Sequence, residues 1–125
     1  QGVPEVLPAL MRAYKVQKKA ADVGFDWEDY QPIKDKIYEE LDELEQEINS
    51  NNQERLEEEL GDILFSVVNL GRFLKINPEF ALTKSVKKFI NRFRYIEQTA
   101  FEQGLQLQEM TLEEMDKLWE DAKQM

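Results

Sequence analysis

Residues 56–74 read LEEELGDILFSVVNLGRFL, and this stretch decides the fold of the 125-residue chain. From Ile63 to Leu74 the side chains are apolar nearly all round, which is typical of a helix buried at the centre of a helical core. Spacings of three and four residues give it one polar ridge, made of Glu59, Asp62, Ser66 and Asn69. We expect its packing stripe on a different face, made of Leu56, Leu60, Leu64, Val67 and Gly71.

Further helices are predicted on both sides of this stretch. Their ends are marked by Pro8 and Gly24, by Pro32 and Ser50, by Asn77-Pro78 and Gly104, and by the capping box of Thr111 and Glu114. Apolar residues recur every three or four positions in two of them, namely at Ile33, Ile37, Leu41, Leu44 and Ile48, and at Val86, Phe89, Phe93, Ile96 and Ala100. No alternating strand pattern is visible in the sequence.

The sequence therefore predicts an all-α fold, an antiparallel four-helix-bundle-like arrangement with an additional short C-terminal helix. Its broad apolar faces also suit a second copy of the chain, so we expect a dimer. Residues 1–125 have the size of a single domain. The chain begins with Gln1 rather than methionine, so a second expectation is that it is a fragment of a longer protein.

Composition excludes several classes of protein. The 16 basic and 26 acidic side chains give a net charge of −10, which argues against a general nucleic-acid binder. Since histidine and cysteine are both absent, zinc enzymes, Ser-His-Asp hydrolases and disulfide-bonded folds are ruled out. No segment approaches the roughly 20 apolar residues that span a bilayer, and no signal peptide is visible. We expect a soluble, cytoplasmic protein.

Two acidic pairs point to a metal site. Glu40 and Glu43 flank the apolar stripe of the second helix, and Glu59 and Asp62 belong to the ridge of the third. If these helices pack antiparallel, their four carboxylates converge and repel each other unless a cation lies among them. Oxygen ligands without histidine favour Mg²⁺ or Mn²⁺, with Ca²⁺ less favoured. The alternative is a solvated acidic face, although the helix around the ridge is too apolar to favour it.

The fourth helix carries the opposite charge. Five of the 16 basic residues fall between Lys84 and Arg94, and one stripe of this segment holds Lys84, Lys88, Arg92 and Tyr95. These basic residues have two interpretations. They form salt bridges to the acidic helices, or they form an anion site beside the metal. Trp119 and Lys123, four residues apart on the last helix, add a stacking surface and a cation. Phe25 and Trp27 either stack on a base or fill the core.

Together these residues resemble the MazG family of nucleoside triphosphate pyrophosphohydrolases. The resemblance runs from about Leu7 to Lys123 and is carried by the following segments. They are Val23-Gly24-Phe25-Asp26-Trp27, Glu39-Glu40-Leu41-Asp42-Glu43, Glu59-Leu60-Gly61-Asp62, Val68-Asn69-Leu70, Lys88-Phe89-Ile90-Asn91-Arg92-Phe93 and Met115-Asp116-Lys117-Leu118-Trp119.

The resemblance implies a dimeric all-α enzyme that hydrolyses nucleoside triphosphates to monophosphate and pyrophosphate with Mg²⁺, clearing non-standard or excess nucleotides. It implies these site residues: metal ligands Glu40, Glu43, Glu59 and Asp62, with Glu43 and Glu40 catalytic, and substrate-binding residues Lys88, Arg92, Trp119, Lys123 and Asn69. It also implies the C-terminal copy of a two-domain protein. The competing hypotheses are a non-enzymatic acidic interaction module and a regulatory copy of the fold.

Overall fold

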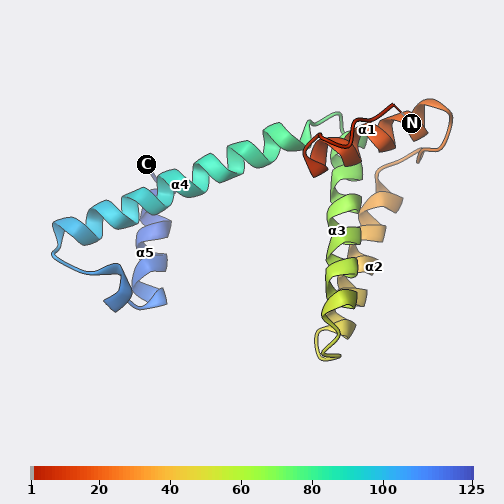
Figure 1. Cartoon of the computed structure of the whole chain (residues 1–125). Coiled ribbons are helices and arrows are strands. Elements are labelled where there is room, and N and C mark those ends of the chain that lie inside the picture. Colours follow the sequence, from red (N-terminus) through yellow and green to blue (C-terminus); the bar gives the residue numbers. More distant parts are fainter. Residues whose placement is uncertain (1) are drawn as a thin grey trace. The chain divides into compact units, whose positions relative to one another are not determined.

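The computed structural model describes residues 2–125, and in that stretch it contains helices and no strands (Figure 1). The elements are α1 (Ala9–Asp22), α2 (Gln31–Glu47), α3 (Gln53–Phe73), α4 (Pro78–Glu102), the 3₁₀ turn η1 (Leu107–Glu109) and α5 (Leu112–Ala122). The all-α prediction is confirmed. None of the helices within residues 2–125 has both the length and the apolar character needed to cross a bilayer.

Local capping chemistry explains where these helices begin. Asn52 Oδ1 accepts the backbone N–H of Arg55 at 3.2 Å, and Asn77 Oδ1 accepts a backbone N–H three residues on at 3.1 Å. Thr111 and Glu114 form the predicted capping box, with reciprocal bonds of 3.1 and 2.8 Å. These bonds confirm the predicted starts of α4 and α5 and show where α3 begins.

The chain divides into two compact units, one reaching to Ala81 and the other running from Leu82 to Met125. The boundary lies in the first turn of α4. Each unit has buried side chains of its own, Ile33, Ile63 and Val68 in the first and Ile96 and Ala100 in the second. The expectation of a single domain over residues 1–125 stays a prediction.

In the first unit α2 and α3 form an antiparallel hairpin (Figure 1). Only residues 48–52 connect them, and Glu47 near the end of α2 pairs with Arg55 near the start of α3 at 3.2 Å. Helix α1 packs on the C-terminal half of α3, where Gln17 Nε2 donates to the backbone oxygen of Phe65 at 2.9 Å. Helix α3 is therefore the element that both neighbours share.

The buried face of α3 differs from the predicted one. Glu59 and Ile63 are buried on the side of α2, whereas Leu60, Leu64 and Val67 remain about half exposed, at 50, 51 and 47%. The physical reason is that α1 and α2 cover only two sides of a helix that is apolar nearly all round. The expectation of a helix buried on every side is wrong for the chain by itself.

The second unit packs α5 against α4. The rings of Phe89 and Trp119 lie 5.3 Å apart between centroids, and Phe89 stacks with Phe93 at 6.1 Å. Ile96 and Ala100, farther along the same apolar stripe of α4, are buried. The predicted periodicity of α4 thus identifies the side on which α5 packs. The four-helix-bundle arrangement itself stays a prediction.

Candidate functional site

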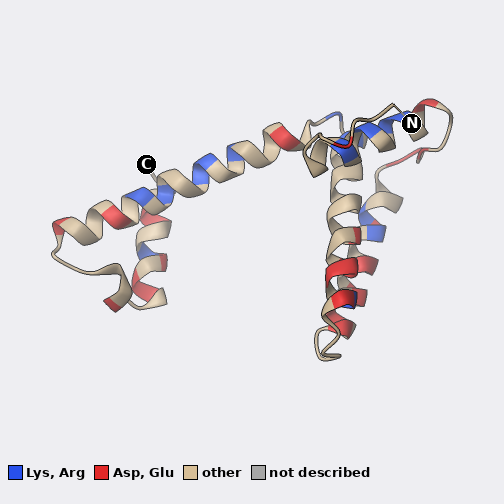
Figure 2. Cartoon of the chain, viewed as in Figure 1, with Lys and Arg blue, Asp and Glu red and all other residues tan. Residues whose placement is uncertain are grey.

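Three carboxylates from the α2–α3 hairpin meet in the first unit. Glu40, Glu43 and Glu59 each place one carboxylate oxygen within 4.8 Å of the others. Glu40 and Glu43 lie one turn apart on α2, and the antiparallel packing brings Glu59 of α3 beside them. Figure 2 shows acidic residues gathered on this hairpin. The predicted convergence is confirmed for these three residues.

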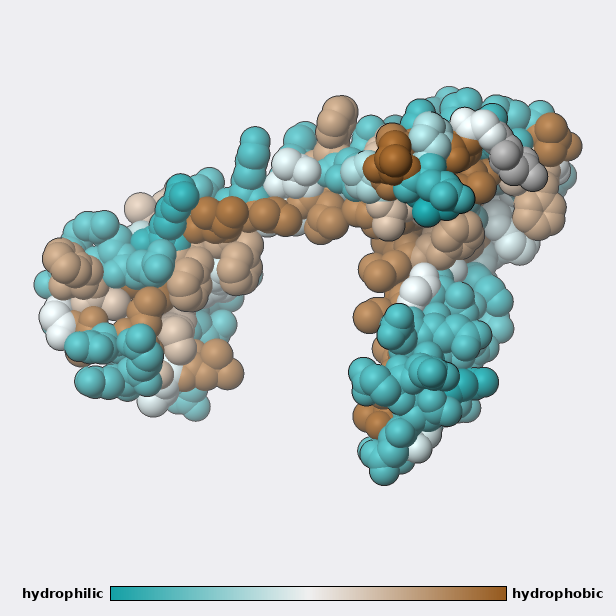
Figure 3. Space-filling view, viewed as in Figure 1, coloured by the Kyte–Doolittle hydropathy of each residue, from teal (hydrophilic) through white to brown (hydrophobic). Residues whose placement is uncertain are grey.

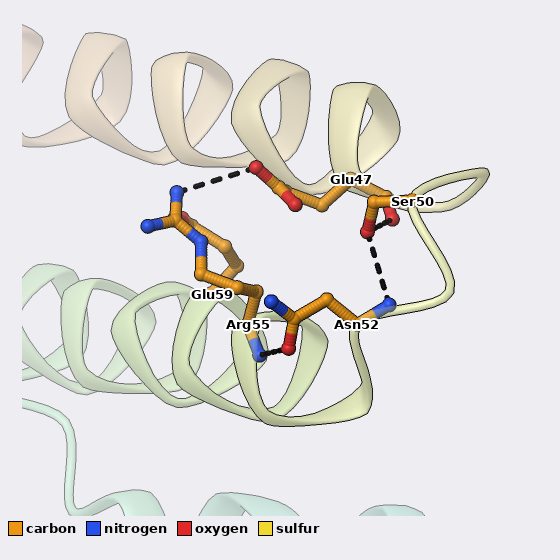
Figure 4. A network of polar contacts seen from close by, with 5 residues as sticks. All are labelled: Glu47, Ser50, Asn52, Arg55 and Glu59. Atoms are coloured by element: carbon orange, nitrogen blue, oxygen red, sulfur yellow. Dashed lines mark hydrogen bonds and ion pairs between the residues drawn. The ribbon is translucent and has the colours of Figure 1, made fainter.

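Two basic side chains neutralise the outer oxygens of this cluster. Lys36 Nζ lies 3.3 Å from Glu40 Oε1, and Arg55 Nη2 lies 3.8 Å from Glu59 Oε1. The hydrogen bond with Glu40, reinforced by the charge of Glu39, raises the pKa of Lys36 above its ordinary value. Figure 4 shows Arg55 beside Glu47 and Glu59 at the turn end of the hairpin.

The inner oxygens of the cluster have no such neighbours. Glu40 and Glu59 are only 6 and 7% exposed, and the Oε2 atom of each is buried with no hydrogen-bond partner among the described residues. A buried polar group left unpaired costs about 1–3 kcal/mol, and a charged one costs more. A hard divalent cation bound by these oxygens would remove that cost. The donor set of the cluster therefore fits a metal of the Mg²⁺ type.

Asp62 does not belong to this group of three. It lies one turn after Glu59 on α3 and is exposed. Asn69 lies two turns farther along the same polar ridge, where its Oδ1 accepts the Nε–H of Arg72 at 3.0 Å. The structure thus separates the predicted ridge into a buried carboxylate at one end and an amide held by arginine at the other.

Three of the four predicted basic residues come together in the second unit, and Lys84 does not join them. Lys88, Arg92 and Lys123 line one cavity of about 300 Å³ between α4 and α5. The guanidinium carbon of Arg92 lies over the Trp119 ring, 5.4 Å from its centre, so the two side chains form a cation–π contact. Lys123 also pairs with Glu120 at 3.3 Å. Such a concentration of cations suits an anion with several negative charges.

An ion pair that sequence reasoning missed ties the loop after α1 to α3. Arg72 Nη2 lies 2.6 Å from Asp26 Oδ1, and its Nη1 donates to Asp26 Oδ2 at 3.3 Å. The hydrogen bond with Arg72 lowers the pKa of Asp26, although partial burial acts in the opposite direction. The sequence offered one indication of this pair, because Arg72 is the only basic residue between Ile63 and Leu74 and a cation in so apolar a segment needs an acidic partner.

Comparisons with known proteins identify relatives of this chain. The family model described as MazG nucleotide pyrophosphohydrolase domain matches residues 28–97. The nucleoside triphosphate pyrophosphohydrolase of Escherichia coli strain K12 is 46% identical over 123 residues, which are 97% of this chain and 47% of that protein.

Two further relatives extend the comparison. The nucleoside triphosphate pyrophosphohydrolase/pyrophosphatase MazG of Thermotoga maritima is 46% identical over 118 residues, covering 94% of this chain and 45% of that protein. The uncharacterized protein YabN of Bacillus subtilis is 55% identical over 73 residues, covering 58% of this chain and 15% of that protein. The chain spans about half the length of the E. coli and T. maritima relatives.

Proposed function

Because this chain belongs to the MazG nucleotide pyrophosphohydrolase family, we propose that it hydrolyses nucleoside triphosphates to monophosphate and pyrophosphate in a Mg²⁺-dependent reaction. The names of the E. coli and T. maritima relatives support this activity. The observation that carries the proposal is the pair of buried oxygens on Glu40 and Glu59 that have no hydrogen-bond partner within residues 2–125. An acidic interaction surface or a purely regulatory module gains nothing from buried carboxylates without partners.

We propose that Glu40, Glu43, Glu59 and Asp62 hold the metal, with Mn²⁺ as a possible substitute for Mg²⁺. Bound there, the ion supplies positive charge for the triphosphate oxygens and lowers the pKa of a bound water. Asp62 is included because it lies one turn from Glu59 and is free to reach a ligand from the exposed side. Its inclusion rests on the family motif rather than on proximity.

Glu43 is the best placed of the three clustered carboxylates to act on water. It is half-buried, whereas Glu40 and Glu59 are buried, so its carboxylate is the one that solvent reaches. We assign to Glu43, supported by Glu40, the orientation and deprotonation of the attacking water. The water oxygen forms a bond to phosphorus as the bridge between the α- and β-phosphates breaks, and the water proton passes to the carboxylate.

The cations of the second unit are assigned to the charge that builds up on the leaving pyrophosphate. Lys88, Arg92 and Lys123 provide an ammonium, a guanidinium and a second ammonium on one cavity. Trp119 would contact the nucleoside through its ring, and Asn69 would contact it from α3. Clearance of non-standard or excess nucleotides in the cytoplasm, without nucleic acid or membrane as a partner, is the role that we propose for this activity.

We also propose a homodimer that forms through α3. The stripe of Leu60, Leu64 and Val67 is half exposed because α1 and α2 leave that side of α3 open. Figure 3 shows hydrophobic side chains along one side of α3, next to the hydrophilic surface of the hairpin. An apolar stripe of this kind that the chain's own helices leave uncovered favours pairing with a second copy. We propose in addition that the chain is the C-terminal copy of a longer, two-domain protein.

The test is a panel of nucleoside triphosphates with and without Mg²⁺, in which monophosphate and pyrophosphate are both quantified. We expect Glu40→Gln and Glu59→Gln to lower kcat/KM on the order of 100-fold, since each removes a buried ligand charge. Glu45→Gln makes the same change at an exposed position of α2 and is the matched control. Release of orthophosphate alone, or full activity in both ligand variants, would contradict the proposal.

A further inference from the structure

Arg92 is held in place differently from the other cations of its cavity. It lines the space between α4 and α5 together with Lys88 and Lys123. Lys123 pairs with Glu120 at 3.3 Å, whereas no carboxylate forms an ion pair with Arg92 in the described part of the chain. Its guanidinium carbon lies instead over the ring of Trp119, 5.4 Å from the ring centre. An aromatic ring is therefore the neighbour that restrains this arginine.

Restraint by a ring leaves the charge of the guanidinium available. Arginine has five N–H donors, and a carboxylate that grips two of them also cancels the positive charge. Asp26 does this to Arg72, with distances of 2.6 and 3.3 Å. An indole attracts the cation but carries no net charge and no oxygen that competes for the donors. Arg92 is thus fixed in position and still able to bind an anion.

Trp119 is itself fixed by α4. Its ring centre lies 5.3 Å from that of Phe89, with the two planes tilted by 51°, and Phe89 stacks with Phe93 at 6.1 Å. The backbone oxygen of Trp119 accepts the N–H of Lys123 at 3.2 Å, so the indole lies one helical turn before that lysine. The ring therefore packs on the helix that carries Arg92 and belongs to the helix that carries Lys123.

The indole does not itself line the cavity. The described residues that line it include Lys88, Arg92 and Lys123 but not Trp119. The side chain of Arg92 both lines the cavity and contacts the ring, so it connects the ring with an anion bound there.

We propose that Trp119 is a positioning residue for the polyphosphate, which it serves by holding the guanidinium of Arg92 at the cavity. The inference rests on the proposed function, which assigns the cations of this cavity to the leaving pyrophosphate. It deepens the nucleoside contact assigned to Trp119 above, and the two roles differ in one consequence. A nucleoside contact affects only ligands that carry a nucleoside, whereas positioning of Arg92 also affects inorganic pyrophosphate.

The first measurement is the affinity of the full chain for inorganic pyrophosphate, followed by phosphorus NMR in EDTA at low ionic strength. We expect Trp119→Leu to weaken binding about three- to tenfold, because it removes the cation–π contact. Trp119→Phe keeps a ring with a weaker attraction for cations and should weaken binding less. Phe101→Leu removes a ring from a side chain of α4 that is 82% exposed and should leave the affinity unchanged.

A double-mutant cycle separates positioning from a general loss of structure. In an Arg92→Gln background the cation is gone, so Trp119→Leu should have no further effect on pyrophosphate binding. A ring that only supports the packing of α5 on α4 would weaken binding equally in both backgrounds, which would overturn the inference. If Trp119→Leu does not fold, Trp119→Phe takes its place in the cycle.

This inference and the proposed hydrolysis can fail separately. The binding measurement contains neither metal nor nucleoside, so coupling between Trp119 and Arg92 supports the inference even if no triphosphate is hydrolysed. Unchanged pyrophosphate binding in Trp119→Leu overturns it, while Mg²⁺-dependent hydrolysis by the wild-type chain would leave the proposed function standing.

Discussion

At the scale of single residues, the two carboxylate oxygens of Glu40 and of Glu59 have different surroundings. Each has one oxygen neutralised by a basic side chain and a second oxygen that is buried and finds no partner in the described part of the chain. The side chains of Lys36 and Arg55 are about half exposed, so they limit the repulsion within the cluster but do not fill its centre. The chain can therefore fold with this cluster when no metal is bound, and a bound metal would stabilise the fold further.

This arrangement predicts that Mg²⁺ stabilises the folded chain. At a concentration 100 times the dissociation constant, a ligand that binds only the folded state adds about 2.7 kcal/mol. We expect the melting temperature to rise with Mg²⁺ in the wild type and in Glu45→Gln, and to respond much less in Glu59→Gln. Differential scanning calorimetry over a Mg²⁺ series checks this. An unchanged Mg²⁺ response in Glu59→Gln would remove Glu59 from the metal site.

At the scale of the elements, local chemistry predicted where helices begin and end, but not which face of α3 is buried. Asn52, Asn77 and Thr111 act within three residues of the helix start, so their roles can be inferred from the sequence. For α3 the apolar periodicity did not show which side chains are buried, because Leu60, which is half exposed, and Ile63, which is buried, are both apolar and lie one turn apart. The packing of α2 and α1 determines which apolar side chains of α3 are buried.

Contacts between distant residues were also beyond sequence reasoning. Gln17 meets Phe65 and Asp26 meets Arg72 across more than 40 positions of the chain. The acidic cluster was predictable because its members follow helical spacing on two helices joined by a short turn. The pair of Asp26 and Arg72 was not, because nothing in the spacing of these two residues connects them.

The pair of Asp26 and Arg72 predicts a pH dependence of stability. Its hydrogen bond holds the pKa of Asp26 below the unfolded value of about 3.9. The unfolded chain therefore binds the proton more readily, so this contribution is present above about pH 4 and is lost as the pH falls through the lower pKa of the folded state.

We expect Asp26→Asn to lose about 0.5–1 kcal/mol of unfolding free energy at pH 7, a range that allows for the partial exposure of the pair. The difference from the wild type should shrink as the solution is acidified below pH 4. Urea denaturation at a series of pH values measures it, with Asp116→Asn as an exposed control. A difference that is constant across the series would mean that the ion pair contributes nothing.

At the scale of the whole molecule, opposite charges are distributed over different elements. Acidic residues gather on the α2–α3 hairpin and basic residues recur along α4 (Figure 2). Although the net charge is −10, the second unit has a cavity lined by the basic residues Lys88, Arg92 and Lys123. A protein of this overall charge is suited to a polyanion only where cations are concentrated in this way.

The proposed dimer gives a prediction at the same scale. Leu64→Glu places a charge on the half-exposed stripe of α3, so we expect it to shift the chain toward the monomer. Leu112→Glu introduces the same charge at a side chain that is 79% exposed and should leave the oligomeric state unchanged. Sedimentation velocity over a range of protein concentrations distinguishes the two variants. Identical behaviour of both would argue against pairing through α3.

The short turn between α2 and α3 also has a consequence for the order of events in folding. All three clustered carboxylates belong to one hairpin, and Glu43 and Glu59 are separated by a connection of only residues 48–52 and the adjoining helix ends. Closing so small a loop costs little chain entropy, and contacts between near neighbours form early. The hairpin can therefore assemble while the rest of the chain is still being synthesised, and a divalent cation present at that stage would bind the nascent hairpin and favour its native pairing.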